Sequence, residues 1–226
     1  ASGNILAENG QQVLQMVTDP HVRADYLNQA ERHNLKFLVF DEPTRQEFLA
    51  QTKNLNKKVD PQRVIVTGPP VDPRIIACRK NKTPWQLGVK QKKLNLCLTT
   101  GGLGTNKNEI KQILQQLLPE LKKPDSPYQL MVYVGTHQDL YKMVKTLAHQ
   151  AKIKPNEISE QDPADFRLGG DLTQAPELPP AIKSVLNSAP LSLIYHPQII
   201  DANELLTHFA FPWADGFISK PSGDMA

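Results

Sequence analysis

The sequence predicts an α/β fold with mainly parallel sheets, and three observations support this expectation. Short apolar runs typical of β-strands alternate along the chain with longer segments whose apolar residues repeat at the helical spacing. Hydrophobic residues make up 39% of the 226 residues, which is enough to form a buried core. Glycine-containing turns follow two of the apolar runs, as they do in open α/β sheets that bind ligands.

Six apolar runs have the length and composition of strands, and a seventh is shorter. The expected strands are Gln12–Thr18, Phe37–Phe40, Arg63–Thr67, Leu94–Thr99, Gln129–Val134 and Leu191–Tyr195, with Gly216–Ser219 as the short seventh. Because helical segments separate most of them, the strands are expected to pair in parallel.

Three segments between these runs predict amphipathic helices. Thr44–Thr52 follows Pro43, and Thr44 is a candidate N-cap. Lys107–Leu121 and Gln138–Gln150 each carry one apolar stripe, which is expected to lie on a sheet. The two stripes consist of Ile110, Ile113, Leu114, Leu117 and Leu118, and of Leu140, Tyr141, Val144, Leu147 and Ala148.

The chain is expected to contain two domains and a linker. Residues 1–70 are assigned to an incomplete first domain, residues 71–93 to the linker, and residues 94–226 to a second domain truncated at its end. Prolines and basic residues between Gly68 and Lys93 favour a solvated linker, with contact to phosphate or anionic lipid as the alternative. The stretch from Pro155 to Pro180 is expected to form a long loop.

Charge, cysteines and hydropathy exclude several functions. The 26 Lys and Arg against 23 Asp and Glu give a net charge of +3, so no nucleic-acid partner is expected. Cys78 and Cys97 form neither a CxxC pair nor a cluster with histidines, so no disulfide framework or metal site is expected. No apolar run approaches the ~20 residues of a membrane span. The cysteine pattern favours a reducing, cytoplasmic location, with peripheral membrane contact left open.

The segment Thr99–Thr105, TTGGLGT, is the strongest candidate for ligand binding. Its three glycines permit positive φ angles, and the helix expected from Lys107 directs free N–H groups and a positive dipole end at the turn. A phosphate or diphosphate fits such a turn. The segment matches neither the P-loop nor a complete GxGxxG pattern, so a purely structural turn is the alternative.

Residues 215–223, DGFISKPSG, predict a second turn of the same kind. Lys220 is a candidate phosphate contact, and the Ser222 hydroxyl and the Gly223 amide offer hydrogen bonds. A solvated loop lysine is the alternative. Because ligands bind at the carboxyl ends of parallel strands, the two turns are expected to converge on one crevice.

Several other polar residues follow expected strands. His21, His137 and His196 are candidates to face a cleft, although loop histidines are more often simply exposed. Asp41 and the next residue, Glu42, are better placed to cap a helix than to perform acid–base chemistry. The aromatic residues of 209–213 are expected to pack in the core around a turn.

The order of motifs along nearly the whole chain resembles a known family. These motifs are VTDP, FLVFDEPTRQEFL, VIVTGPPVDP, LCLTTGGLGTN, YQLMVYVGTH, IIDANELL and ADGFISKPSG. The pattern is similar to the GT-B glycosyltransferases that include the lipid II-forming N-acetylglucosaminyltransferase MurG and the monogalactosyldiacylglycerol synthases.

The resemblance implies a hexosyltransferase with two Rossmann-like domains. It implies inverting transfer from a UDP-sugar, without a metal or cofactor, to a lipid or glycan acceptor. The residues implied for the donor diphosphate are Gly101, Gly102, Leu103, Gly104, Thr105, Ser222 and Gly223. The residues implied for the uracil ring are Ile199 and Ile200.

The sequence departs from the family pattern at the second turn. Ser222 stands where a glycine is usual, and Met225 stands where a threonine is expected. The ribose-binding glutamate would follow Ala226 and the catalytic base would precede Ala1, so this chain alone is expected to lack turnover. A non-catalytic nucleotide-sugar-binding protein and a UDP-sugar 2-epimerase are the alternatives. A nicotinamide dehydrogenase is disfavoured, because the strand after TTGGLGT ends in YVGTH without an acidic residue.

Overall fold

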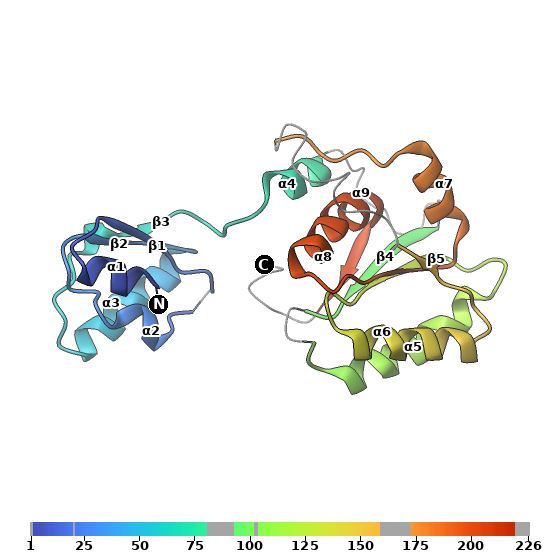
Figure 1. Cartoon of the computed structure of the whole chain (residues 1–226), viewed down its shortest axis with the longest axis horizontal. Coiled ribbons are helices and arrows are strands. Elements are labelled where there is room, and N and C mark those ends of the chain that lie inside the picture. The colour runs from blue at the N-terminus through green and yellow to red at the C-terminus, as the bar shows by residue number, and fades with distance from the viewer. Residues whose placement is uncertain (1, 20, 81–92, 102–103, 159–172, 220–226) are drawn as a thin grey trace. The chain divides into compact units, whose positions relative to one another are not determined.

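The computed structural model describes residues 2–19, 21–80, 93–101, 104–158 and 173–219 of the chain. Their contacts divide the chain into two units, one within Ala1–Val71 and one within Asp72–Ser222 (Figure 1). Each unit contains one parallel sheet flanked by helices. The prediction of an α/β fold with parallel sheets is therefore confirmed.

The first unit is built on a parallel sheet with the strand order β1-β2-β3. The strands are β1 (Val13–Met16), β2 (Leu35–Val39) and β3 (Val64–Val66). The helices are α1 (Ser2–Glu8), α2 (Ala24–Leu27), α3 (Glu42–Asn54) and the 3-10 turn η1 (Pro61–Arg63). Helix α1, which precedes β1 and contacts it, was not predicted.

Helix α3 begins earlier than the sequence predicted. Asp41, and not Thr44, is its N-cap: the Asp41 carboxylate accepts a hydrogen bond of 2.8 Å from the Thr44 backbone N–H. The Thr44 hydroxyl also donates to this carboxylate, and the two bonds hold the pKa of Asp41 below its usual value. The capping role expected for Asp41 is confirmed.

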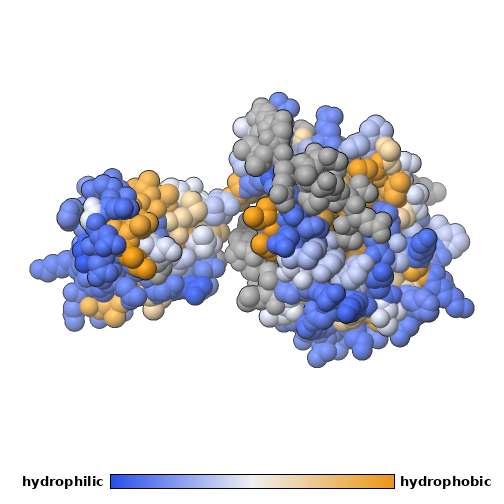
Figure 2. Space-filling view, viewed as in Figure 1, coloured by the Kyte–Doolittle hydropathy of each residue, from blue (hydrophilic) through white to orange (hydrophobic). Residues whose placement is uncertain are grey.

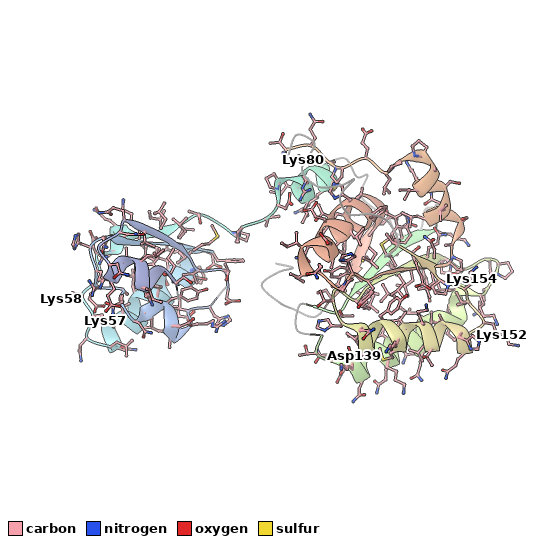
Figure 3. The ribbon with its side chains drawn as sticks, in the orientation of Figure 1. Lys57, Lys58, Lys80, Asp139, Lys152 and Lys154 are labelled. Atoms are coloured by element: carbon pink, nitrogen blue, oxygen red, sulfur yellow. The ribbon has the colours of Figure 1, made fainter. Side chains whose placement is uncertain are left out.

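Beyond the helix, Lys57, which is labelled in Figure 3, donates to the Glu31 carboxylate at 2.7 Å.

The core of the first unit lies on one face of its sheet. Alternate residues of β2 are buried on this face, and Phe37 meets Phe48 of α3 with 4.4 Å between ring centroids. On the opposite face Leu14 remains 66% exposed and Ile65 38% exposed. Hydrophobic residues accordingly interrupt the hydrophilic surface of this unit (Figure 2). Parallel sheets are usually covered on both faces, so this surface is unusually apolar.

The second unit contains a five-stranded parallel sheet with the order β6-β7-β5-β4-β8. The strands are β4 (Leu94–Thr99), β5 (Tyr128–Tyr133), β6 (Asn156–Glu157), β7 (Leu191–Ile194) and β8 (Gly216–Ile218). The helices are α4 (Pro73–Lys80), α5 (Lys107–Leu121), α6 (Gln138–Gln150), α7 (Pro180–Ser188), α8 (Ile199–Leu205), the π-helix η3 (Leu206–Ala210) and α9 (Phe211–Trp213).

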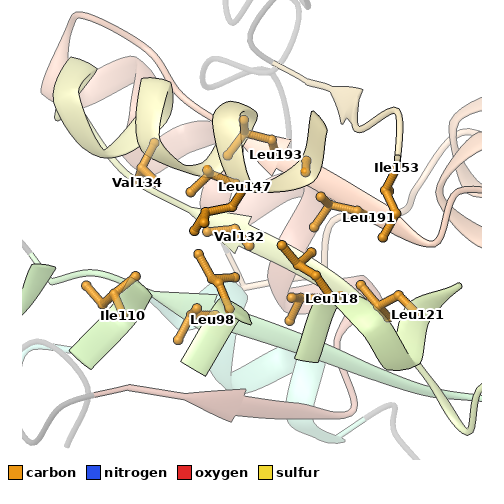
Figure 4. Packing of buried hydrophobic residues seen from close by; sticks show 14 of the residues in the cluster. Leu98, Ile110, Leu118, Leu121, Val132, Val134, Leu147, Ile153, Leu191 and Leu193 are labelled. Carbon is orange, nitrogen blue, oxygen red and sulfur yellow. The ribbon is translucent and has the colours of Figure 1, made fainter. Parts of the chain in front are cut away.

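Helices cover both faces of this sheet (Figure 1). On one face, Leu98 and Val132 pack with the apolar stripes of α5 and α6 (Figure 4). On the other face, Cys97 and Met131 pack with the helical segments on either side of β7, including Phe209. Adjacent residues of a strand point to opposite faces, so one strand supplies both cores.

Four expectations about the second unit need correction. The linker assigned to 71–93 contains helix α4, and the loop expected from Pro155 to Pro180 contains β6 and ends at α7. Phe209 and Trp213 do pack in the core, but the aromatic residues of 209–213 lie in a helical segment and not around a turn. Helices α7 and α8 were not predicted.

Among the described residues, no helix is long and apolar enough to span a membrane.

Candidate functional site

The strand order of the second unit reverses beside β4. The chain passes from β4 to β5 and on to β7 in one direction, and β8 then pairs on the other side of β4. In open parallel sheets, ligands bind at the carboxyl ends of the strands where the order reverses. Leu98 of β4 pairs with Ile218 of β8, so the segments that follow these two strands begin at the same level of the sheet.

The glycine turn begins at this edge, directly after β4. Gly101 and Gly104 have φ angles of +71° and +56°, which glycine adopts readily. The Gly104 N–H donates to the Gly101 carbonyl at 3.1 Å and closes the turn. Asn106 has a φ of +63° and precedes α5 without a side-chain capping bond. The N-terminus of α5 therefore follows the turn directly, as predicted.

Two buried hydroxyl groups lie at the end of β4. Thr99 and Thr100 are only 5% and 2% exposed. Within the described ranges, neither hydroxyl oxygen has a hydrogen-bond partner. Buried polar groups are nearly always hydrogen-bonded, but the buried Ser192 hydroxyl inside β7 is equally unpartnered among the described residues, so the two threonines do not by themselves indicate a ligand. Both threonines belong to the predicted segment Thr99–Thr105, but only residues 101–105 of it were assigned a role in binding.

The loop after β5 joins the glycine turn through His137. A Cβ atom added at Gly104 would lie 2.6 Å from Nδ1 of His137 and 2.7 Å from its Cε1 and Cγ. The imidazole ring therefore lies directly on Gly104. His137 also occupies the N-cap position of α6, but its side chain makes no capping hydrogen bond there.

The loop after β7 is tied to the same edge of the sheet. The His196 N–H donates to the Gly135 carbonyl at 3.1 Å, and His196 Nδ1 lies 3.5 Å from the carboxylate of Asp201. Ile199 and Ile200 begin α8 and are 51% and 67% exposed. The structure thus connects the turns after β4, β5 and β7 by direct contacts.

The remaining predicted site residues lie elsewhere or outside the described ranges. His21 is exposed and belongs to the first unit, and its role as a residue that faces a cleft stays a prediction. Thr105 follows the glycine turn and is exposed. Gly102, Leu103, Lys220, Ser222 and Gly223 fall outside the residues that the structure describes.

A partly buried ion pair anchors α8, whose first turn carries Ile199 and Ile200. The Arg74 guanidinium of α4 donates to both carboxylate oxygens of Glu204, at 2.9 and 3.0 Å, and to the Asp72 carboxylate at 2.6 Å. These charge-assisted bonds raise the pKa of Arg74, and the bonds from Arg74 hold the pKa of Asp72 below its usual value.

Arg74→Met is expected to lower the free energy of unfolding of the second unit by about 2 kcal/mol at pH 7, because it leaves Glu204 without its bidentate partner. Urea unfolding followed by circular dichroism measures this difference. The matched control is Lys123→Met, whose partner Glu120 is exposed, and it should leave the unfolding midpoint nearly unchanged. Equal midpoints for both variants would contradict the anchoring role.

The effect of Arg74→Met should also depend on pH. The pKa of Asp72 is lower in the folded protein than its ordinary 3.8, so its pairing stabilises the fold above about pH 4. This contribution is lost as the pH falls through the lowered folded pKa. The stability difference between the wild-type chain and Arg74→Met should therefore shrink below pH 4, which unfolding curves between pH 3 and pH 7 measure.

The fold and this edge define an α/β protein whose second sheet is compatible with a Rossmann-like fold and reverses its strand order beside a glycine turn. Comparisons with protein-family models, curated proteins and solved structures found no match. Within the described residues, no group of three or more His, Cys, Asp or Glu side chains has the arrangement of a metal site.

Proposed function

We propose that the second unit is the donor-binding domain of a GT-B glycosyltransferase, which transfers a hexose from a UDP-sugar to a lipid or glycan acceptor with inversion. The observation that carries this proposal is the position of the glycine turn: it leaves β4 at the point where the strand order reverses towards β8. The first unit is assigned in this proposal to the acceptor domain. The reaction is placed in the cytoplasm, with peripheral membrane contact for a lipid acceptor.

The turn offers the right chemistry for the leaving diphosphate. The Gly104 N–H donates to the Gly101 carbonyl, and the N-terminus of α5 follows with its free N–H groups. The unpartnered hydroxyls of Thr99 and Thr100 add two hydrogen-bonding groups at its base. Such fixed donors stabilise the negative charge that develops on UDP as its bond to the sugar breaks, without requiring a metal ion.

The start of α8 supplies a second part of the donor site. Ile199 and Ile200 expose apolar side chains at the carboxyl edge of the sheet, where the base of the nucleotide would lie. The bond from Arg74 to Glu204 fixes this helix, so the two positions are held by a rigid element. In the proposed reaction, the acceptor hydroxyl gives its proton to a general base and its oxygen attacks the anomeric carbon, while the bond from that carbon to UDP breaks on the opposite face.

Calorimetric titration of the chain with UDP, UDP-N-acetylglucosamine, UDP-galactose and NAD tests the proposal. UDP and at least one UDP-sugar should bind, and NAD should not. ADP serves as the control for base recognition, because it keeps the diphosphate and changes the base. Binding of NAD in place of UDP, or binding of none of these compounds, would overturn the proposal.

A further inference from the structure

We propose that Asn203 of α8 recognises the base of the donor nucleotide through its side-chain amide, and that Tyr133 of β5 positions this amide. The inference rests on the proposed function, which places the base against the start of α8, and it adds two residues to that site. The carrying observation is one hydrogen bond: the Tyr133 hydroxyl donates to Oδ1 of Asn203 at 2.8 Å.

The Tyr133 hydroxyl lies close to the loop that follows β5. Tyr133 is the last residue of the strand, and a Cβ atom added at Gly135 would lie 3.5 Å from its hydroxyl oxygen. The Gly135 carbonyl also accepts the hydrogen bond from the His196 N–H, in the loop after β7. The bond from Tyr133 therefore holds Asn203 at the carboxyl edge of the sheet, where ligands of such sheets bind.

The bond from Tyr133 also fixes which side of the Asn203 amide faces outward. Tyr133 is 7% exposed, and burial raises the pKa of its hydroxyl to about 12, so the group stays protonated at neutral pH and donates. Oδ1 is the acceptor of the amide, and Nδ2 carries its two donors. Asn203 itself is exposed, and among the described residues its Nδ2 has no hydrogen-bond partner. The amide thus offers N–H donors to a ligand.

The position of Asn203 on α8 fits contact with the base. Ile199 lies four positions earlier, so the two side chains occupy the same face of the helix, one turn apart. The neighbouring acidic side chain, Glu204, is already bound by Arg74. A base that packs on Ile199 can accept a hydrogen bond from Asn203 at a ring carbonyl, and uracil has two such carbonyls.

Asn203→Leu, which removes the donor and keeps the approximate size of the side chain, tests this contact. Its affinity for UDP, measured by calorimetric titration, should fall about fivefold, the size of one neutral hydrogen bond. Its affinity for uridine, measured by ligand-detected NMR, should fall by the same factor. Tyr133→Phe should weaken both ligands about threefold, because the amide is no longer held in one orientation before the ligand binds.

The double variant Tyr133→Phe/Asn203→Leu shows whether Tyr133 acts through Asn203. It should bind UDP as weakly as Asn203→Leu alone, whereas two independent effects would multiply. A purely structural role of Tyr133 would lower the affinity of the double variant further. Tyr128→Phe is the matched control: Tyr128 begins the same strand and donates to the Leu117 carbonyl at 3.1 Å, so this change should leave the UDP affinity unchanged.

The outcomes separate this inference from the proposed function. If the wild-type chain binds UDP and Asn203→Leu binds it equally well, the contact is wrong while the donor site stands. If Asn203→Leu weakens UDP but not uridine, the amide does not contact the base and the inference is overturned. If Tyr133→Phe has no effect, or if its loss multiplies with that of Asn203→Leu, the positioning role is wrong. If the wild-type chain binds no UDP, the proposed function fails and this inference fails with it.

Discussion

Gly101→Asp is expected to bind UDP at least tenfold more weakly than Gly101→Asn. Gly101 has a φ of +71°, a conformation that both Asn and Asp adopt more readily than other side chains. The two substituents have nearly the same shape, so they differ in charge alone. A carboxylate about 4 Å from a phosphate is repelled by about 4 kcal/mol per pair of unit charges near a protein surface, before salt screens it.

Calorimetric titration of both variants with UDP measures this difference, and thermal unfolding shows whether each remains folded. The difference should become smaller at high salt, since screening weakens the repulsion. Equal UDP affinities for two folded variants would mean that the diphosphate lies away from the turn.

Phe37→Ala should have the largest effect on stability in the first unit, with a loss of about 3–5 kcal/mol in the free energy of unfolding. Phe37 is fully buried between the sheet and α3, and its ring meets Phe48 at 4.4 Å. Removing the ring leaves a cavity that the short strands of this sheet cannot fill. Leu14→Ala is the matched control on the same sheet: Leu14 is 66% exposed, so the loss should stay below about 0.5 kcal/mol.

Two spectroscopic signals assign this effect to one unit. Trp213 is buried in the second unit, so its fluorescence reports on the unfolding of that unit. In urea, Phe37→Ala should shift the circular dichroism transition of the first unit while the fluorescence transition keeps its midpoint. An unfolding curve for Phe37→Ala that coincides with that of Leu14→Ala would contradict the described core.

The sequence predicted the second sheet more accurately than the rest of the chain. Helices α5 and α6 have the predicted bounds. Each has a long amphipathic stripe and lies between two clear strands, so both signals place the helix in the same segment. Helix α1 was missed because it is short and contains glycine and asparagine, which are weak helix formers. The helical segment that continues from α8 was not predicted because it contains Pro212. This proline is tolerated because it lies at the start of α9.

The parts of the candidate site that could be predicted are those whose geometry depends on a single segment of the chain. The positive φ angles of Gly101 and Gly104 follow from the glycines, and the adjacency of β4 and β8 follows from the general topology of open α/β sheets. The contact between His137 and Gly104 depends on the register of β4 and β5 and on the path of two loops, which no local pattern specifies. His21 also follows a strand, but that strand belongs to the other unit.

Hydrogen–deuterium exchange of the wild-type chain, with and without saturating UDP, tests the central claim most directly. We expect slower exchange in peptides that cover residues 99–106 and 135–138, because these segments follow β4 and β5 at the carboxyl ends of the parallel strands. Peptides of the first unit should exchange at unchanged rates. Unchanged exchange in residues 99–106, or slowing confined to other segments, would contradict the assignment of a nucleoside-diphosphate site to this edge.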